Sequence, residues 1–110
     1  MKALTLMAVL CLAAAVAAGA AEDGQGLFKS NGCMSCHRPE SSSKVNPSLG
    51  EIAKAYQGKT NQLADYLAGA ADPIVRPERA AMMKRYLEKT RAMSDQERKA
   101  LAEFIMSHTN

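Results

Sequence analysis

The chain begins with an apolar segment that differs from the rest of the sequence. Residues 1–21 carry a single charge, Lys2, followed by a long apolar run that ends in small residues (AAGAA). A charged start, an apolar middle and an A-x-A site are typical of a secretory signal peptide. We expect cleavage after Ala20 or Ala21, which leaves residues 22–110 as the domain. An uncleaved anchor helix is the alternative, since a membrane span needs roughly 20 apolar residues.

After this segment, apolar positions recur every three or four residues, with turn residues between short segments. This spacing is typical of amphipathic helices, and no run has the alternation of a β-strand. The predicted elements are a helical segment over 23–32, a polar loop over 38–47, a helix from Ser48, a helix capped by Thr60 or Asn61 that stops at Gly69, a helix from Pro77 to about Thr90, and a final helix from Ser94. The pattern therefore predicts an all-α domain of four to five short helices.

Serine and glutamate pairs mark the starts of two of these helices. Ser48 is followed three residues later by Glu51, and Ser94 by Glu97, which is the spacing of a capping box. Pro77 suits the first position of a helix, where its missing N–H is not needed. The apolar face of the final helix comprises Leu101, Phe104, Ile105 and His108.

Composition narrows the class of protein. The chain has 110 residues, of which 47% are apolar and 23% charged, and a formal net charge of +3. These values argue against a wholly disordered chain and against a polytopic membrane protein. The weak positive charge and the few aromatic residues give no basis for nucleic-acid binding. A domain this short buries only about 60–65% of its unfolded surface, so a cofactor acting as core would stabilise it.

The cysteines carry the most specific chemical signal. Cys11 lies in the predicted signal peptide as an apolar filler, whereas Cys33 and Cys36 belong to a C-x-x-C-H run that ends at His37. In this spacing the two thiols share one side of a helical turn. There they can add to the two vinyl groups of a haem, and the imidazole can reach the iron. The motif thus predicts one covalent haem c. A disulfide between the two cysteines and a zinc site that recruits His108 are the alternatives.

A haem iron bound by His37 on one side needs a second axial ligand or has an open site. The candidates are Met34, Met82, Met83, Met93, Met106 and His108. Met83 is favoured because it shares a helix face with Tyr86 and Leu87. Met82 is the second choice, since its neighbours at the same spacing are mostly charged.

The other four candidates have structural interpretations. Met34 lies within the haem-attachment loop and cannot turn to the far face of the haem. Met93 precedes a helix start, where an apolar residue acts as a staple, and Met106 is interpreted as helix packing. His108 lies in the last turn of its helix, where a histidine commonly interacts with the free carbonyl groups.

These features resemble the class I cytochromes c, especially the small periplasmic monohaem proteins of bacteria. The similar stretches are residues 25–29 (QGLFK), 45–47 (VNP), 52–56 (IAKAY) and 93–105. In the family, a glycine and an aromatic residue of the first helix meet the last helix. The resemblance also implies that the Pro47 carbonyl accepts a hydrogen bond from His37, which fixes the tautomer of the ring. Asn46 stands where the family has glycine, and Met82 and Met83 lie farther from the last helix than the family's axial methionine.

The resemblance implies short helices wrapped around one covalent haem, and one-electron carriage in the periplasm of a Gram-negative bacterium. We expect His37 and Met83 as axial ligands, a monomer, and transient docking on redox proteins. We expect no enzymatic activity, no nucleic-acid partner and no stable membrane insertion after signal cleavage. The alternative function is a haem sensor or small-ligand-binding cytochrome with an open or weakly held sixth site. The basic residues of the segment 84–99 either steer an acidic partner or form a solvated helix face.

Overall fold

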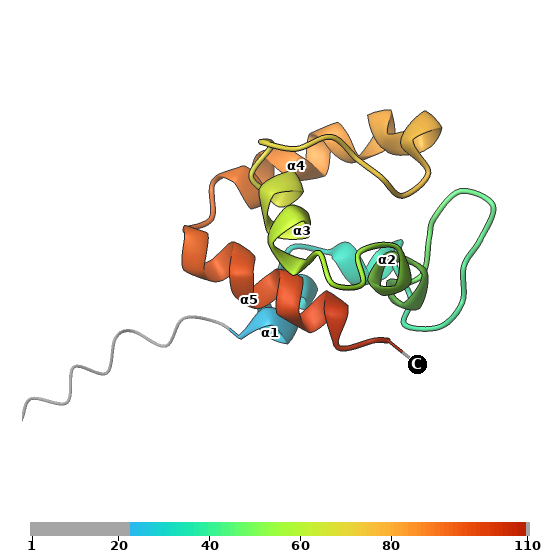
Figure 1. The fold of residues 1–110 in the computed structure, drawn as a ribbon, viewed down its shortest axis with the longest axis horizontal. Coiled ribbons are helices and arrows are strands. Elements are labelled where there is room, and N and C mark those ends of the chain that lie inside the picture. Colours follow the sequence, from blue (N-terminus) through green and yellow to red (C-terminus); the bar gives the residue numbers. More distant parts are fainter. Residues whose placement is uncertain (1–22, 110) are drawn as a thin grey trace, which may run out of the picture.

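The computed structural model describes residues 23–109, which form helices and connecting loops (Figure 1). The elements are α1 (Gly24–Ser30), the 3₁₀ helix η1 (Cys33–Ser35), α2 (Leu49–Ala55), α3 (Thr60–Leu67), the 3₁₀ helix η2 (Pro77–Met83), α4 (Lys84–Arg91) and α5 (Asp95–Met106). No strand occurs among these residues, so the predicted all-α fold is confirmed. The predicted signal peptide lies outside the described part of the chain. None of the described helices is long and apolar enough to cross a membrane.

The first and last helices cross at very short range, and α5 also contacts α2 and α3 (Figure 1). Gly24 is buried at the α1–α5 crossing. A Cβ atom on Gly24 would lie 2.1 Å from the Ala100 carbonyl oxygen and 2.6 Å from the Phe104 Cβ. The rings of Phe28 and Phe104 pack beside it with their centroids 5.4 Å apart. The expected glycine–aromatic contact therefore exists, but Gly24 provides it from just before the stretch 25–29 that carries the resemblance.

The two predicted capping boxes differ in the structure. At α5, the Glu97 N–H donates to Ser94 Oγ at 3.1 Å and the Ser94 N–H donates to Glu97 Oε1 at 2.9 Å. At α2, the Glu51 N–H donates to Ser48 Oγ at 3.0 Å, but the Ser48 N–H donates to Ser42 Oγ instead. The prediction is thus confirmed for α5 and half wrong for α2, because other partners occupy the Glu51 carboxylate.

Helix α3 begins at Thr60, so Thr60 and Asn61 lie within the helix and not at the N-cap position predicted for one of them. Lys59 is the N-cap residue, without a side-chain hydrogen bond to the helix, so the predicted cap is wrong. Leu63 and Leu67 are both buried, and their packing holds the helix without a polar cap. The predicted stop is confirmed, since Gly69 adopts a positive φ of 76° directly after the helix.

The helix predicted from Pro77 to about Thr90 is in fact two elements. Its first part is the 3₁₀ helix η2, and an α-helix starts only at Lys84. No residue of η2 is buried, so little tertiary packing favours α-helical geometry there. α4, in contrast, is attached to α3 by the buried hydroxyl of Thr90, which donates to the Leu67 carbonyl at 2.7 Å. Met82 and Met83 therefore lie at the end of a 3₁₀ helix. Met83 is also the N-cap residue of α4, so it keeps its predicted spacing to Tyr86 and Leu87.

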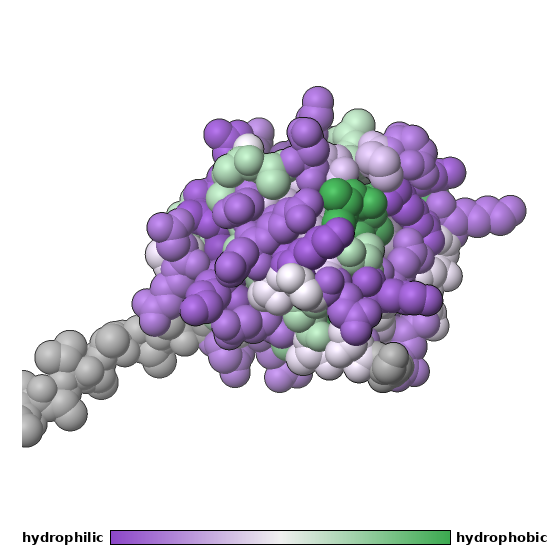
Figure 2. All heavy atoms as spheres, viewed as in Figure 1, coloured by the Kyte–Doolittle hydropathy of each residue, from purple (hydrophilic) through white to green (hydrophobic). Residues whose placement is uncertain are grey.

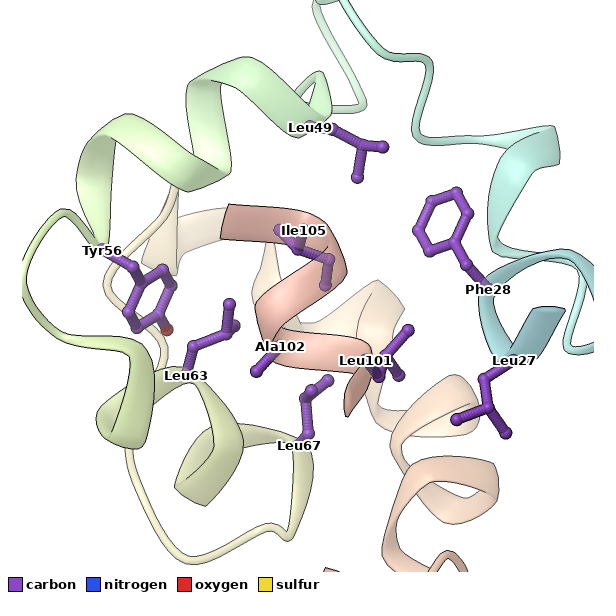
Figure 3. Close-up of a cluster of buried hydrophobic side chains, with 9 residues drawn as sticks. All are labelled: Leu27, Phe28, Leu49, Tyr56, Leu63, Leu67, Leu101, Ala102 and Ile105. Atoms are coloured by element: carbon purple, nitrogen blue, oxygen red, sulfur yellow. The ribbon is translucent and has the colours of Figure 1, made fainter. Parts of the chain in front are cut away.

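The core consists of side chains from four of the helices together with the residue that ends α2. They converge on one central region in Figure 3, from both sides of α5. The cluster is formed by Leu27, Phe28, Leu49, Tyr56, Leu63, Leu67, Leu101, Ala102 and Ile105. Met93 and Met106 pack against this cluster, which confirms the interpretation of Met106 as a packing residue.

Candidate functional site

The core contains a cavity of about 180 Å³ that opens to the surface. Seven of the nine core side chains line its wall: Phe28, Leu49, Tyr56, Leu63, Leu67, Leu101 and Ile105. Figure 2 shows a strongly apolar patch enclosed by hydrophilic residues, in the part of the view between α4 and α2. The core of the described domain is therefore not closed on itself but surrounds an apolar space that reaches the surface.

The C-x-x-C-H run borders this cavity. Gly32, in the left-handed conformation, ends the link from α1, and η1 follows from Cys33. The N–H groups of Cys36 and His37 donate to the Cys33 carbonyl at 3.2 and 2.9 Å, which curls the run into a tight turn. Both cysteines are free thiols, and burial raises the pKa of the Cys33 thiol. The turn thus brings two thiols and one imidazole to one wall of the cavity.

The imidazole of His37 is buried and has a defined orientation. Its Nδ1 lies 2.8 Å from the Pro47 carbonyl oxygen, so the contact that the resemblance implies is confirmed. A carbonyl oxygen can only accept a hydrogen bond, so the proton is on Nδ1. The lone pair of Nε2 is then free to bind a metal.

The structure separates Met83 from the other candidate ligands. Met82 and Met83 both line the cavity, and the side chain of Met83 is half-buried and contacts His37. Met82 is 61% exposed. Among the described residues, none of the other four candidates, Met34, Met93, Met106 and His108, belongs to the cavity wall. One thioether therefore lies where it faces the imidazole.

His108 has the structural role expected for the end of a helix. Its Nδ1 lies 3.0 Å from the Phe104 carbonyl oxygen, and its ring packs edge-on against the Phe104 ring at 4.9 Å. Within residues 23–109, no group of three or more His, Cys, Asp or Glu side chains could hold a metal ion. The four-ligand zinc site considered from the sequence is therefore not formed by these residues.

Several polar residues of the cavity wall were not predicted to line the site. They are Arg76 just before η2, Arg79 within η2, Lys89 on α4, and the phenols of Tyr56 and Tyr66. Burial raises the pKa of both phenols, so they are neutral at pH 7. No local signal in the sequence connects the basic residues with the cavity. All the cationic side chains of the wall thus come from the segment after α3.

Comparison with known proteins identifies the class to which this site belongs. Residues 21–109 match the family model described as Cytochrome c. The match covers most of the chain and includes the C-x-x-C-H turn, the loop with Pro47 and the last helix. A search of curated proteins gives no match.

Proposed function

The chain belongs to the cytochrome c family, and from this premise we propose that it is a periplasmic one-electron carrier with His/Met axial ligation. The family's cofactor is haem c, which is covalently bound and contains iron. When bound, this group supplies an iron that gains and loses one electron. The chain's own residues must therefore attach the group, hold its two axial positions and exclude water.

The residues present fit such a group. The seven core side chains of the cavity wall provide apolar surface for a large ring, and they leave the core incomplete without it. Cys33 and Cys36 would form the two thioether bonds, and the Nε2 atom of His37 would bind the iron. The Pro47 carbonyl, 2.8 Å from Nδ1, would keep this tautomer in both oxidation states.

Met83 would hold the opposite axial position. A thioether is a soft ligand that favours ferrous iron and raises the reduction potential. Support for this assignment comes from the contact between Met83 and His37 and from the greater exposure of Met82. The convergence of the C-x-x-C-H turn and Met83 on one apolar cavity is the observation that carries the proposed function.

An optical spectrum of the purified holoprotein tests this proposal. We expect low-spin haem in the wild type, high-spin haem in Met83→Ala, and low-spin haem in the matched variant Met82→Ala. Haem that resists extraction into acidified acetone would support covalent attachment. High-spin haem in the wild type that binds CO readily would contradict the carrier and favour the ligand-binding or sensor alternative.

We further propose that residues 1–21 direct export and are removed after Ala20 or Ala21, leaving residues 22–110 as a monomeric domain. Export would bring the cysteines to the compartment in which bacteria attach haem covalently. Redox partners would dock transiently through an interface below about 1,200 Å², and we propose no catalytic role. Intact mass measurement of the periplasmic fraction tests the cleavage. Full-length protein in the membrane fraction would instead indicate an anchor.

A further inference from the structure

The hydrogen bond between His37 and Pro47 depends on the loop 38–47, which extends beyond α2 as a long arc (Figure 1). The base of the loop is held by the Leu49 N–H, which donates to the Arg38 carbonyl at 2.8 Å. Its far end folds into a small turn, because the Asn46 N–H donates to Ser43 Oγ at 2.9 Å. These local bonds shape the loop, and the Ser48 N–H, which donates to Ser42 Oγ at 3.0 Å, attaches it to the start of α2.

Arg76 adds a second attachment, from the segment before η2. Its Nη1 donates to the Ser43 carbonyl at 2.7 Å. Its Nε and Nη2 form a bidentate pair with the Glu51 carboxylate, each at 2.8 Å. Ser42 Oγ also donates to Glu51 Oε1 at 2.8 Å. One guanidinium group thus joins the loop directly through Ser43 and indirectly through Glu51 and Ser42.

The backbone of Arg76 shows that its place is constrained. Arg76 has a φ of 45°, the only positive φ among the described non-glycine residues. It also precedes Pro77, and the helical region is disfavoured before a proline. The left-handed conformation costs an L-residue about 1–2 kcal/mol, so it persists where surrounding contacts impose it. The three hydrogen bonds of the guanidinium provide such contacts.

We propose that Arg76 is a positioning residue for His37: it fastens the loop 38–47 and so keeps the Pro47 carbonyl on the imidazole. This inference rests on the proposed function, in which His37 binds the haem iron. An exposed ion pair contributes little to stability, but a bidentate arginine pair that also holds a loop carbonyl fixes geometry. The positioning role of Arg76 is therefore tested by a measurement on the His37 imidazole, and not by the unfolding free energy alone.

Hydrogen exchange of the His37 Nδ1–H, followed by NMR in the reduced holoprotein, is the direct test. We expect Arg76→Ala to exchange about tenfold faster than the wild type, the equivalent of one lost hydrogen bond. Arg76→Gly removes the same side chain but relieves the backbone strain. Its His37 Nδ1–H should therefore exchange as fast as in Arg76→Ala, while the variant unfolds at a higher denaturant concentration than Arg76→Ala. Lys44→Ala is the matched control, because it removes a positive charge from the same loop where no side-chain hydrogen bond is present among the described residues.

The reduction potential gives a second readout that a purely structural role would not move. The double variant Arg76→Gln/Glu51→Gln keeps the net charge and removes the pair. Because a weaker hydrogen bond from Nδ1 makes the imidazole a less basic ligand, the potential should rise above that of the wild type.

The outcomes separate this inference from the proposed function. Wild-type exchange rates and potential in the Arg76 variants, with histidine-bound haem present, would overturn the role of Arg76 alone. A wild-type holoprotein without histidine-bound haem would instead overturn the proposed function, and the role of Arg76 with it.

Discussion

The two walls of the cavity are built in different ways. The histidine side, formed by η1, the loop 38–47 and α2, is held by hydrogen bonds at several points between Cys33 and Glu51. The methionine side, formed by η2 and α4, has no buried residue in η2, and Met82 on it is 61% exposed. Its attachment to α3 includes the single buried hydroxyl of Thr90.

This difference indicates which side of the site opens more easily. A segment with few buried contacts opens locally at a lower free-energy cost than one packed in the core. We therefore expect the ligand from the methionine side to be displaced first by heat, denaturant or small ligands. The imidazole of His37 should stay bound until the domain unfolds. The following predictions test this contrast, from the largest expected effect to the smallest.

The strongest perturbation of the histidine side is Gly24→Ala. The new Cβ would meet the Ala100 carbonyl at 2.1 Å, so α1 must move away from α5 and carry η1 with it. We expect a loss of about 3 kcal/mol in unfolding free energy, measured by guanidinium denaturation. Gly50→Ala is the control, since its Cβ would meet atoms only at 3.5 Å or more and helix propensity favours alanine. Equal stabilities for the two variants would contradict the close crossing.

On the methionine side, Thr90→Val removes the buried hydroxyl and leaves the Leu67 carbonyl without that donor. The expected cost is about 1–2 kcal/mol. Because α4 leads directly from Met83, the variant should also lose its low-spin spectrum at a lower temperature than that of global unfolding. Thr90→Ser keeps the hydroxyl and should restore both properties. Simultaneous loss of the spectrum and of the fold in Thr90→Val would show that the two sides are equally stable.

The smallest effect concerns the pH dependence of the histidine side. Hydrogen bonds from Arg76 hold the pKa of the Glu51 carboxyl below its ordinary value. A carboxyl with a lowered pKa stabilises the fold above its unfolded pKa, and this stabilisation disappears as the pH falls through its folded pKa.

With its side chain 34% exposed, Glu51 should contribute less than about 1 kcal/mol in this way. Thermal unfolding between about pH 3 and 6, a range that spans the ordinary glutamate pKa, should therefore depend less on pH in Glu51→Gln than in the wild type. Glu103→Gln removes the same charge from an exposed position of α5. A wild-type pH dependence in Glu51→Gln would contradict the linkage.

Local signals in the sequence predicted much of this molecule. At the helix starts Ser48 and Ser94, the serine hydroxyl accepts a hydrogen bond from the N–H three residues later, and the C-x-x-C-H run forms its own turn. The family resemblance led to the contact of His37 with Pro47. Each of these features is encoded within a short stretch or a shared motif, so the chain around it does not need to be known.

The features that escaped prediction depend on residues far apart in the chain. Glu51 was expected to complete a capping box, but Arg76, 25 residues later, takes its carboxylate. The division between η2 and α4 reflects which part of the segment finds a packing partner. Met83 was predicted within one continuous helix but lies at the junction of η2 and α4, and the structure places its side chain against His37.

The shared use of seven side chains by the core and the cavity wall has a consequence for how this sequence can change. A larger side chain at one of these positions would fill the apolar space and strengthen the polypeptide without its cofactor. The same substitution would take up room that the haem requires. Selection for a stable apoprotein and selection for haem capture therefore oppose each other at these seven positions. Larger side chains can raise stability without reducing the space for haem only at core positions outside the wall, such as Leu27 and Ala102.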